Sequence, residues 1–457
     1  MGERLVVIGG TAAGLSAASK AKRMCPSMDI TVYERSGFVS YGACGLPYFV
    51  GGMIADAEDL VSLNVQTLSE KRGIPTYTHH EVTSIDRQAK TVTVRNLDSG
   101  ETFVKPYDRL VIATGATPIV PGIPGARSKG VHCLRTVEDG IALKARVAEG
   151  AVRAVIIGGG FIGLETAEEL TQAGMKVTVV EAMPRLLPFL IEEYASSIQA
   201  ELERHGVEVC LNSTAAEVLC DENGKATGVK TSDGREFPAD LVLFSIGVRP
   251  ASDLARDCGL EIGFKGAIVV DEHQRTSDSD IYACGDCVQM KNLITGEPCY
   301  VPLGTTANKQ GRIAGENLGG SNSTFKGVLG SQVTKIFEIY ATSTGLTEAQ
   351  AEQAGFAPAV CSITKNDRAS YYPGGGQNHL TLVLDRHTGK LLGAQAIGTE
   401  TVAGRMNVLA TAITAGMTVM ELNELDLVYS PSVAPVYDPI LIAASQALKC
   451  VDKEARA

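Results

Sequence analysis

The feature that most restricts the fold of this chain is a strand, a glycine-rich turn and a helix close to its start. Residues 5–8 form an apolar run that predicts a buried strand, and Gly9-Gly10-Thr11-Ala12-Ala13-Gly14 follows directly. We expect a helix to about residue 24 and a second strand, 30–33, that ends at Glu34. Such a turn seats a phosphate on a helix N-terminus, and the terminal acid binds ribose hydroxyls. Thr11 replaces the middle glycine of the pattern, so this first match is incomplete.

The same pattern recurs in fuller form after residue 150. Residues 154–157 lead into Gly158-Gly159-Gly160-Phe161-Ile162-Gly163, a helix is predicted to about residue 173, and the strand 176–180 ends at Glu181. Chance rarely supplies strand, turn, helix and acid twice, so we predict one flavin-dinucleotide site and one nicotinamide site. Glu181 favours NADH because a 2′-phosphate would meet like charge there. Arg185 lies nearby and keeps NADPH open as a cosubstrate.

These two units predict an α/β fold class, with two Rossmann-like dinucleotide-binding domains (FAD and NAD) and a C-terminal α+β dimerisation domain. In the last part, strand-like segments at 332–340, 359–364, 381–384 and 391–396 precede helical patterns at 402–415 and 434–448. The predicted ranges are 1–118 for the first part of the FAD-binding domain, 119–249 for the NAD-binding domain, 250–325 for the second part of the FAD-binding domain and 326–457 for the dimerisation domain.

Other segments are expected to return toward the nucleotides. Strands at 108–112 and 241–246 end in glycine-containing turns, and Asp286 is placed to accept hydrogen bonds from ribityl hydroxyls. A helix beginning after Pro302 would direct its positive end at the reduced flavin. The predicted cofactor-binding residues are Gly9, Gly10, Thr11, Ala12, Ala13, Gly14, Glu34, Arg35, Ala113, Thr114, Gly115, Gly158, Gly160, Phe161, Ile162, Gly163, Glu181, Gly247, Gly285, Asp286, Pro302, Leu303 and Thr305.

Composition excludes several other classes. The formal charge of −11 argues against non-specific nucleic-acid binding. No apolar run approaches the roughly 20 residues that span a bilayer, and the N-terminus lacks the apolar core of a signal peptide, so we predict a cytoplasmic protein with no membrane contact. Eleven scattered cysteines fit a reducing compartment. No metal site is predicted, and the one close pair, Cys284 and Cys287, is expected to be structural.

One cysteine is a candidate redox centre. Cys44 lies between Gly42 and Gly45, about ten residues beyond the first βαβ unit. Small neighbours let a planar cofactor and a substrate approach the thiol from two sides. An arbitrary cysteine is more often a small buried hydrophobe, but the two flanking fingerprints favour the redox interpretation here. Its thiolate form would require a lowered pKa.

These motifs resemble the FAD-dependent pyridine nucleotide-disulfide oxidoreductases over nearly the whole chain, and most closely their single-cysteine branch of coenzyme A-disulfide reductases and NADH oxidases. Larger members carry a second cysteine five positions on, where this chain has Phe49, and a catalytic histidine near the C-terminus, where none follows His387. The resemblance implies a homodimer, FAD and NADH as cofactors, and a Cys44 that works alone. Oxygen- and peroxide-reducing members carry histidine in the first glycine turn, where this chain has Ala12.

The resemblance also implies catalytic tyrosines contributed by the partner subunit. Tyr371 or Tyr372, and Tyr429, match such positions, and we take Tyr372 and Tyr429 as catalytic candidates with Cys44. Ser40, Lys20 and Arg23 are the substrate-binding candidates, the last two for coenzyme A phosphates, although a solvated basic helix face explains them equally well. The chain also departs from the usual residues of the branch at Ala43, Val433 and Tyr437, so the identity of the disulfide stays open.

We therefore predict an NAD(P)H-dependent flavoprotein that reduces a small disulfide or persulfide through Cys44, such as coenzyme A disulfide, coenzyme A persulfide or polysulfide. The alternatives are an NADH oxidase or peroxidase that uses a Cys44 sulfenic acid, an electron-transfer flavoprotein that serves a protein partner without needing Cys44, and a slowly turning-over flavin- and NADH-binding redox sensor.

Overall fold

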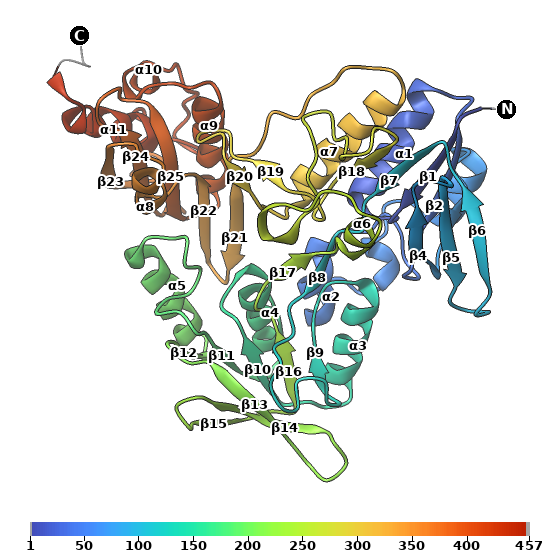
Figure 1. Cartoon of the computed structure of the whole chain (residues 1–457). Coiled ribbons are helices and arrows are strands. Elements are labelled where there is room, and N and C mark those ends of the chain that lie inside the picture. The colour runs from blue at the N-terminus through green and yellow to red at the C-terminus, as the bar shows by residue number, and fades with distance from the viewer. Residues whose placement is uncertain (1, 454–457) are drawn as a thin grey trace.

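The computed structural model describes residues 2–453, and Figure 1 shows three regions in it. The first region is built on a five-stranded parallel sheet in the order β18-β7-β1-β2-β3. Its strands are β1 (Arg4–Ile8), β2 (Asp29–Tyr33), β3 (Thr76–Tyr77), β7 (Arg109–Ile112) and β18 (Ile281–Ala283). The helices α1 (Ala12–Met24) and α7 (Gly304–Leu318) lie side by side against it (Figure 1).

The second region repeats this plan with a parallel sheet in the order β12-β11-β10-β16-β9. Its elements are β9 (Val131–His132), β10 (Arg153–Ile157), β11 (Lys176–Val180), β12 (Glu208–Cys210), β16 (Leu241–Phe244), α3 (Val137–Ala148), α4 (Phe161–Gln172) and α5 (Glu192–Arg204). The strands of both sheets consist mainly of buried, branched apolar residues, because parallel strands are covered on both faces.

Each nucleotide-binding region also carries a small antiparallel sheet. The first has β4 (His80–Asp86), β5 (Thr91–Asn96) and β6 (Thr102–Pro106); the second has β13 (Ala215–Cys220), β14 (Ala226–Thr231) and β15 (Glu236–Pro238). The chain crosses between the two regions at β8 (Ala116–Pro118) and β17 (Val248–Pro250), which pair antiparallel. The shorter connecting elements are α2 (Leu46–Gly51), α6 (Asp253–Asp257), β19 (Met290–Lys291) and β20 (Pro298–Cys299). The domain boundaries given by the sequence stay predictions.

The third region is an antiparallel sheet in the order β21-β22-β25-β24-β23 with helices packed on it. It comprises β21 (Gln332–Ile336), β22 (Ile339–Gly345), β23 (Pro358–Asn366), β24 (Gln377–Asp385), β25 (Leu391–Gly398), α8 (Glu348–Gln353), α9 (Thr401–Thr414), α10 (Val419–Asn423) and α11 (Pro439–Ala447). The β21–β22 hairpin reaches toward α4 and α5 of the second region (Figure 1).

Two sequence-based elements were wrong in this last region. The single strand predicted over 332–340 is a hairpin, because the chain reverses at Phe337, whose φ is +49°. The helix predicted from residue 434 begins at Pro439 instead, where Asp438 accepts a hydrogen bond from the Ile440 N–H and caps it. Proline fits the first turn because that turn leaves backbone N–H groups unpaired.

Candidate active site

The first glycine turn has the geometry expected of a phosphate-binding loop. Gly9 has φ +108°, and a Cβ there would lie 2.2 Å from the Ala113 carbonyl oxygen. A Cβ on Gly14 would lie 1.9 Å from the carbonyl oxygen of Gly9. The turn therefore requires glycine at both ends, which brings α1 close against β1. Glu34 is buried and accepts a hydrogen bond from the Gly10 N–H at 2.7 Å.

The far side of this first site is closed by Asp286 and by α7. Asp286 is buried; its Oδ2 accepts a hydrogen bond from the Arg135 guanidinium at 2.8 Å, and its Oδ1 has no partner among the described residues. Tyr300 donates to the Asp286 carbonyl at 2.8 Å. A buried carboxylate oxygen without a donor costs free energy, so this atom is suited to a hydroxyl-bearing ligand. Beside it, a Cβ on Gly311 of α7 would lie 2.2 Å from the Ala13 carbonyl oxygen.

The second glycine turn repeats the first in detail. Gly158 has φ +113°, and a Cβ on Gly163 would lie 2.2 Å from the Gly158 carbonyl oxygen. Glu181 accepts a hydrogen bond from the Gly159 N–H at 2.6 Å. A Cβ on Gly160 would meet no described atom within 4 Å, so a ligand's pyrophosphate has open space in front of this turn.

Cys44 lies in the short 3-10 turn that leads into α2, next to the second region. The residue is exposed, with its sulfur partly enclosed by protein. That partial burial, followed by the charge of Glu165 on α4, raises the pKa of Cys44, and the charge of Arg135 opposes the rise. The groups of the protein therefore do not supply the lowered pKa expected from the sequence. Phe49 stands at the position where larger members of the resembled family carry a second cysteine. It is buried in α2, and the Lys144 ammonium nitrogen lies 4.0 Å from the centre of its ring.

Comparison with known proteins identifies the architecture. The family model of pyridine nucleotide-disulphide oxidoreductases matches residues 3–311, and the model of their dimerisation domain matches residues 331–438. The chain belongs to the pyridine nucleotide-disulphide oxidoreductase family. It is 38% identical to an NAD(P)H sulfur oxidoreductase (CoA-dependent) of Pyrococcus abyssi, over 96% of this chain and 97% of that protein.

Two solved structures are similar to this oxidoreductase over nearly its whole length. An NAD-dependent persulfide reductase from A. fulgidus is 40% identical with a TM-score of 0.94, covering 98% of this chain and 83% of that one. A water-forming NADH oxidase from Lactobacillus brevis, bound to NADH, is 30% identical with a TM-score of 0.93, covering 98% of each. The family and its neighbours confirm the predicted class of fold and enzyme, an NAD(P)H-dependent flavoprotein oxidoreductase, and its cofactors, FAD and a nicotinamide dinucleotide.

The residues of the first site fit FAD. The glycine turn and Glu34 would hold the adenosine and pyrophosphate end, and the unpartnered Asp286 oxygen would accept from the ribityl chain. Thr305 is exposed in the first turn of α7, after Pro302 and Leu303, where the helix N-terminus begins. Thr114 donates to the Ala251 carbonyl at 2.5 Å and shapes the turn through Ala113 and Gly115. Arg35 is exposed beside Glu34. These assignments stay predictions residue by residue.

At the second glycine turn, the predicted nicotinamide site of this oxidoreductase, Phe161 and Ile162 start α4. The Phe161 ring packs on Phe189 with 5.2 Å between centres. Gly247, at φ +101°, accepts from the Ile119 N–H at 3.0 Å and closes the loop between the two regions.

The candidate tyrosines lie in the third region, on two adjacent loops. The Tyr371 and Tyr429 hydroxyls are 3.4 Å apart, and both rings are exposed. Tyr372 is also exposed. Within residues 2–453, no hydrogen bond or ion pair connects these tyrosines with Cys44 or α2.

The substrate-binding candidates are only partly available. Lys20 forms an ion pair with Glu316 on α7 at 3.0 Å, which neutralises the charge expected to bind phosphate. Arg23 is exposed at the end of α1. Ser40 adopts φ +51°, and its N–H donates to the Gly10 carbonyl at 2.9 Å, so it links the first turn to the segment that carries Cys44.

The pair Cys284 and Cys287 is fully buried next to Asp286, and burial raises the pKa of both thiols. This is the environment of inert structural thiols.

Sequence analysis missed three residues of the site, Arg135, Glu165 and Thr334. Each comes from a segment distant from Cys44 along the chain, and none belongs to a local motif. Thr334 of β21 donates to Glu165 at 2.9 Å, which brings the third region into the surroundings of Cys44.

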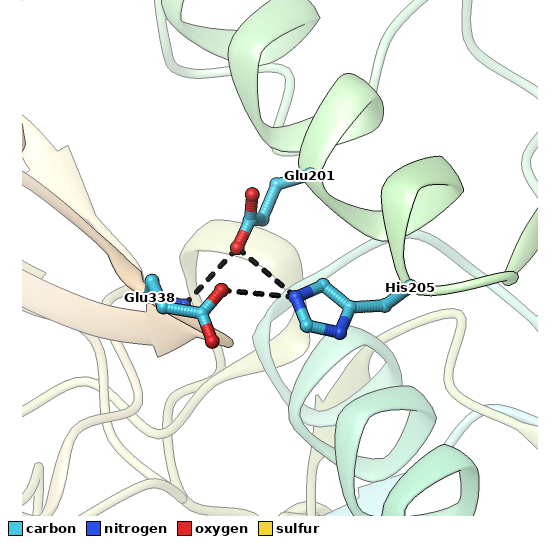
Figure 2. A group of neighbouring side chains, drawn as sticks. All are labelled: Glu201, His205 and Glu338. Atoms are coloured by element: carbon cyan, nitrogen blue, oxygen red, sulfur yellow. Dashed lines mark hydrogen bonds and ion pairs between the residues drawn. The ribbon is translucent and has the colours of Figure 1, made fainter.

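A separate group of acids and histidine, Glu201, His205 and Glu338, joins α5 to the β21–β22 hairpin (Figure 2). His205 Nε2 lies 2.9 Å from Glu338, and its ring stacks on Phe337. The Arg204 guanidinium already bonds both carboxylates. We interpret the group as an ion-pair contact between regions.

Among the described residues, no helix has the length and apolar character to cross a bilayer; the cytoplasmic location stays a prediction.

Proposed function

We propose that this oxidoreductase uses NADH to reduce a small disulfide or persulfide, with coenzyme A derivatives as the foremost candidates. The observation that carries the proposal is the exposed thiol of Cys44, in the 3-10 turn before α2, with buried Phe49 where a second cysteine would stand. The relatives named above as CoA-dependent sulfur oxidoreductase and persulfide reductase support this substrate class.

The chemistry at Cys44 follows from a lone thiol. Its thiolate attacks one sulfur of the substrate, which forms a mixed disulfide and releases the other half as a thiolate that takes up a proton. Two electrons then cleave the mixed disulfide, restoring the Cys44 thiolate and freeing the bound half. FAD, when bound, supplies these electrons by passing on the hydride equivalent that it receives from NADH.

Two features of the chain support the nucleotide assignment. Glu181 follows β11 and opposes a 2′-phosphate, which favours NADH. Gly160 directly precedes α4, and the open space in front of it leaves room for the pyrophosphate of an incoming nucleotide.

We further propose a two-fold homodimer in which Tyr429, with Tyr371 or Tyr372, completes the neighbour's site. The loops that carry them are held by Arg405, which is buried and bonds Asp438 at 2.8 Å and the Asp367 carbonyl at 2.8 Å. Exposed apolar residues flank Tyr429, with Val428 87% and Val436 65% exposed, so this surface fits burial against a second copy. An active monomer in sedimentation at assay concentration would contradict the dimer.

The second candidate is a water-forming NADH oxidase, which the 30% identity with the Lactobacillus brevis enzyme supports less strongly than the 40% identity with the persulfide reductase supports the first. Anaerobic stopped-flow separates the two. The NADH-reduced protein is mixed with coenzyme A disulfide, coenzyme A persulfide, polysulfide or cystine, and in a parallel series with oxygen. We expect flavin reoxidation at least about tenfold faster with one sulfur acceptor than with oxygen, a barrier difference of roughly 1.4 kcal/mol. Faster reoxidation by oxygen would favour the oxidase.

A further inference from the structure

Three glutamates on α4 form a buried acidic group at the junction of all three regions. Glu168 and Glu169 are almost fully buried, and Glu165 is half-buried. The helix α4 packs against α2, which begins directly after Cys44. On the other side, the β21–β22 hairpin contributes Thr334 and Lys335.

The three carboxylates do not share their partners equally. Glu168 bonds the Lys335 ammonium at 2.7 Å and the Phe337 N–H at 2.8 Å, so its charge is compensated. Glu169 lies against Gly51, and its buried Oε1 has no partner in the described part of the chain. Glu165 accepts a hydrogen bond only from the Thr334 hydroxyl, and within residues 2–453 it forms no ion pair.

These surroundings leave Glu165 with an unusual affinity for protons. Burial, together with the charges of Glu168 and Glu169, raises the pKa of Glu165 to about 7, while the Thr334 hydroxyl works against the rise. Burial and Glu168 also raise the pKa of Glu169. Glu165 therefore changes charge close to neutral pH.

Glu165 is also the carboxylate whose charge acts most strongly on Cys44. The other charged groups that face the thiol are Arg135 and Asp286, and these two form an ion pair with each other. Tyr48, on the next turn of α2, faces Glu165, Glu168, Glu169 and Cys44. Ionised Glu165 opposes a thiolate at Cys44, and by linkage a thiolate favours protonated Glu165.

We propose that Glu165 is the proton-accepting partner of Cys44: it binds a proton when Cys44 becomes a thiolate, so that the pair carries one negative charge instead of two. The step moves no electrons. One proton leaves the sulfur, one proton is bound by the carboxylate, and the charge of the site is unchanged. The proposal rests on the proposed function only in taking Cys44 as the reactive thiol.

The test measures the thiol and needs no turnover. The FAD-loaded protein is alkylated with iodoacetamide between pH 5.5 and 9.5, and the rate at the Cys44 peptide is followed by mass spectrometry. In Glu165→Gln we expect a lower Cys44 pKa and alkylation about three- to tenfold faster at pH 7.5, because more of the thiol is then ionised at that pH. The broad profile of the unmutated protein should sharpen to a single ionisation.

Two controls keep the result interpretable. Glu169→Gln makes the same change one turn further along α4 but should not speed alkylation of Cys44, because removing the Glu169 charge lowers the pKa of Glu165 and leaves more of Glu165 ionised at pH 7.5. The buried thiols Cys284 and Cys287 report unfolding, since they react only when the first region opens.

A second variant protects the test if Glu165→Gln unfolds. Thr334→Val removes the hydroxyl that holds the pKa of Glu165 down, so Glu165 stays protonated to higher pH and Cys44 should react about twofold faster at pH 7.5. An unchanged Cys44 profile in folded Glu165→Gln, or in folded Thr334→Val where the first variant unfolds, would overturn the proposal. Neither outcome depends on whether a disulfide is the substrate.

Discussion

The two dinucleotide-binding units share one turn but differ in what surrounds it. Gly9 and Gly158 have nearly the same φ, +108° and +113°, and Glu34 and Glu181 each accept the N–H of the glycine that follows. The first turn, however, is covered at Ala13 by Gly311 of α7 and by Gly285, which precedes buried Asp286. The second faces open space at Gly160, beside Ile162 and Ile246, each 38% exposed.

This difference explains how the same glycine turn can bind two dinucleotides, FAD and NADH, in different ways. The turn and its acid supply phosphate and ribose contacts in both units. We infer that the additional cover makes the first unit a permanent holder of FAD, whereas the open second unit lets NADH enter and leave at every turnover. Variants that act on the cover should therefore affect FAD alone, and variants at the open turn should affect NADH alone.

The largest effect is expected at the contact between α1 and α7. A Cβ in Gly311→Ala would lie 2.2 Å from the Ala13 carbonyl oxygen, which is rigid backbone, so forcing the helices apart costs about 2–3 kcal/mol, the upper part of the usual range for overpacking. We expect FAD binding to weaken by about 30- to 100-fold, measured by flavin fluorescence titration of deflavinated protein. Gly404→Ala, in open space on α9, is the matched control. Unweakened FAD binding in Gly311→Ala would show that the cover is not needed.

Asp286 should have the next largest effect. Asp286→Asn keeps the shape of the side chain but removes the charge that faces Arg135. Since a hydrogen bond involving a charged group contributes about 1.5–3 kcal/mol, we expect FAD to bind roughly tenfold or more weakly, while the ratio of rates with NADH and NADPH stays constant. A change in that ratio would mean that Asp286 influences both units.

Glu181 should affect only the choice of nicotinamide nucleotide. Removing its charge in Glu181→Ala relieves about 1 kcal/mol of repulsion toward a 2′-phosphate, so the ratio of kcat/KM for NADH over NADPH should fall about fivefold. Glu34→Ala, the same change in the first unit, should lower FAD content and leave that ratio alone. Equal kcat/KM for both nucleotides in the unmutated protein would refute the NADH preference.

Gly160 should give the smallest effect. Because a Cβ there meets no described atom within 4 Å, Gly160→Ala should keep its melting temperature and FAD content. The KM for NADH should rise about threefold, since the added methyl group crowds only the incoming pyrophosphate. A loss of FAD in this variant would contradict the separation of the two units.

The sequence predicted what is local and missed what is assembled from distant parts. Glu34 and Glu181 were found because strand, turn and acid follow one another at fixed spacing. Arg135 and Glu165 were not, because each reaches the site from another region and only tertiary packing brings it near Cys44. The hairpin at Phe337 was missed because neither glycine nor proline marks its turn. The pKa of Cys44 depends on burial and on Glu165, which spacing alone does not encode.

The central claim is that Cys44 alone carries electrons to the sulfur substrate, and one set of single-turnover measurements tests it. Cys44→Ser should bind FAD and accept hydride from NADH at an unchanged rate. It should then lose disulfide or persulfide reduction by at least about 100-fold, roughly 3 kcal/mol of barrier for a missing covalent step. Cys284→Ala and Cys287→Ala should stay within a few-fold of the unmutated protein. Retained activity in Cys44→Ser, with loss in either of the other two, would place the redox centre at the buried pair and contradict the account.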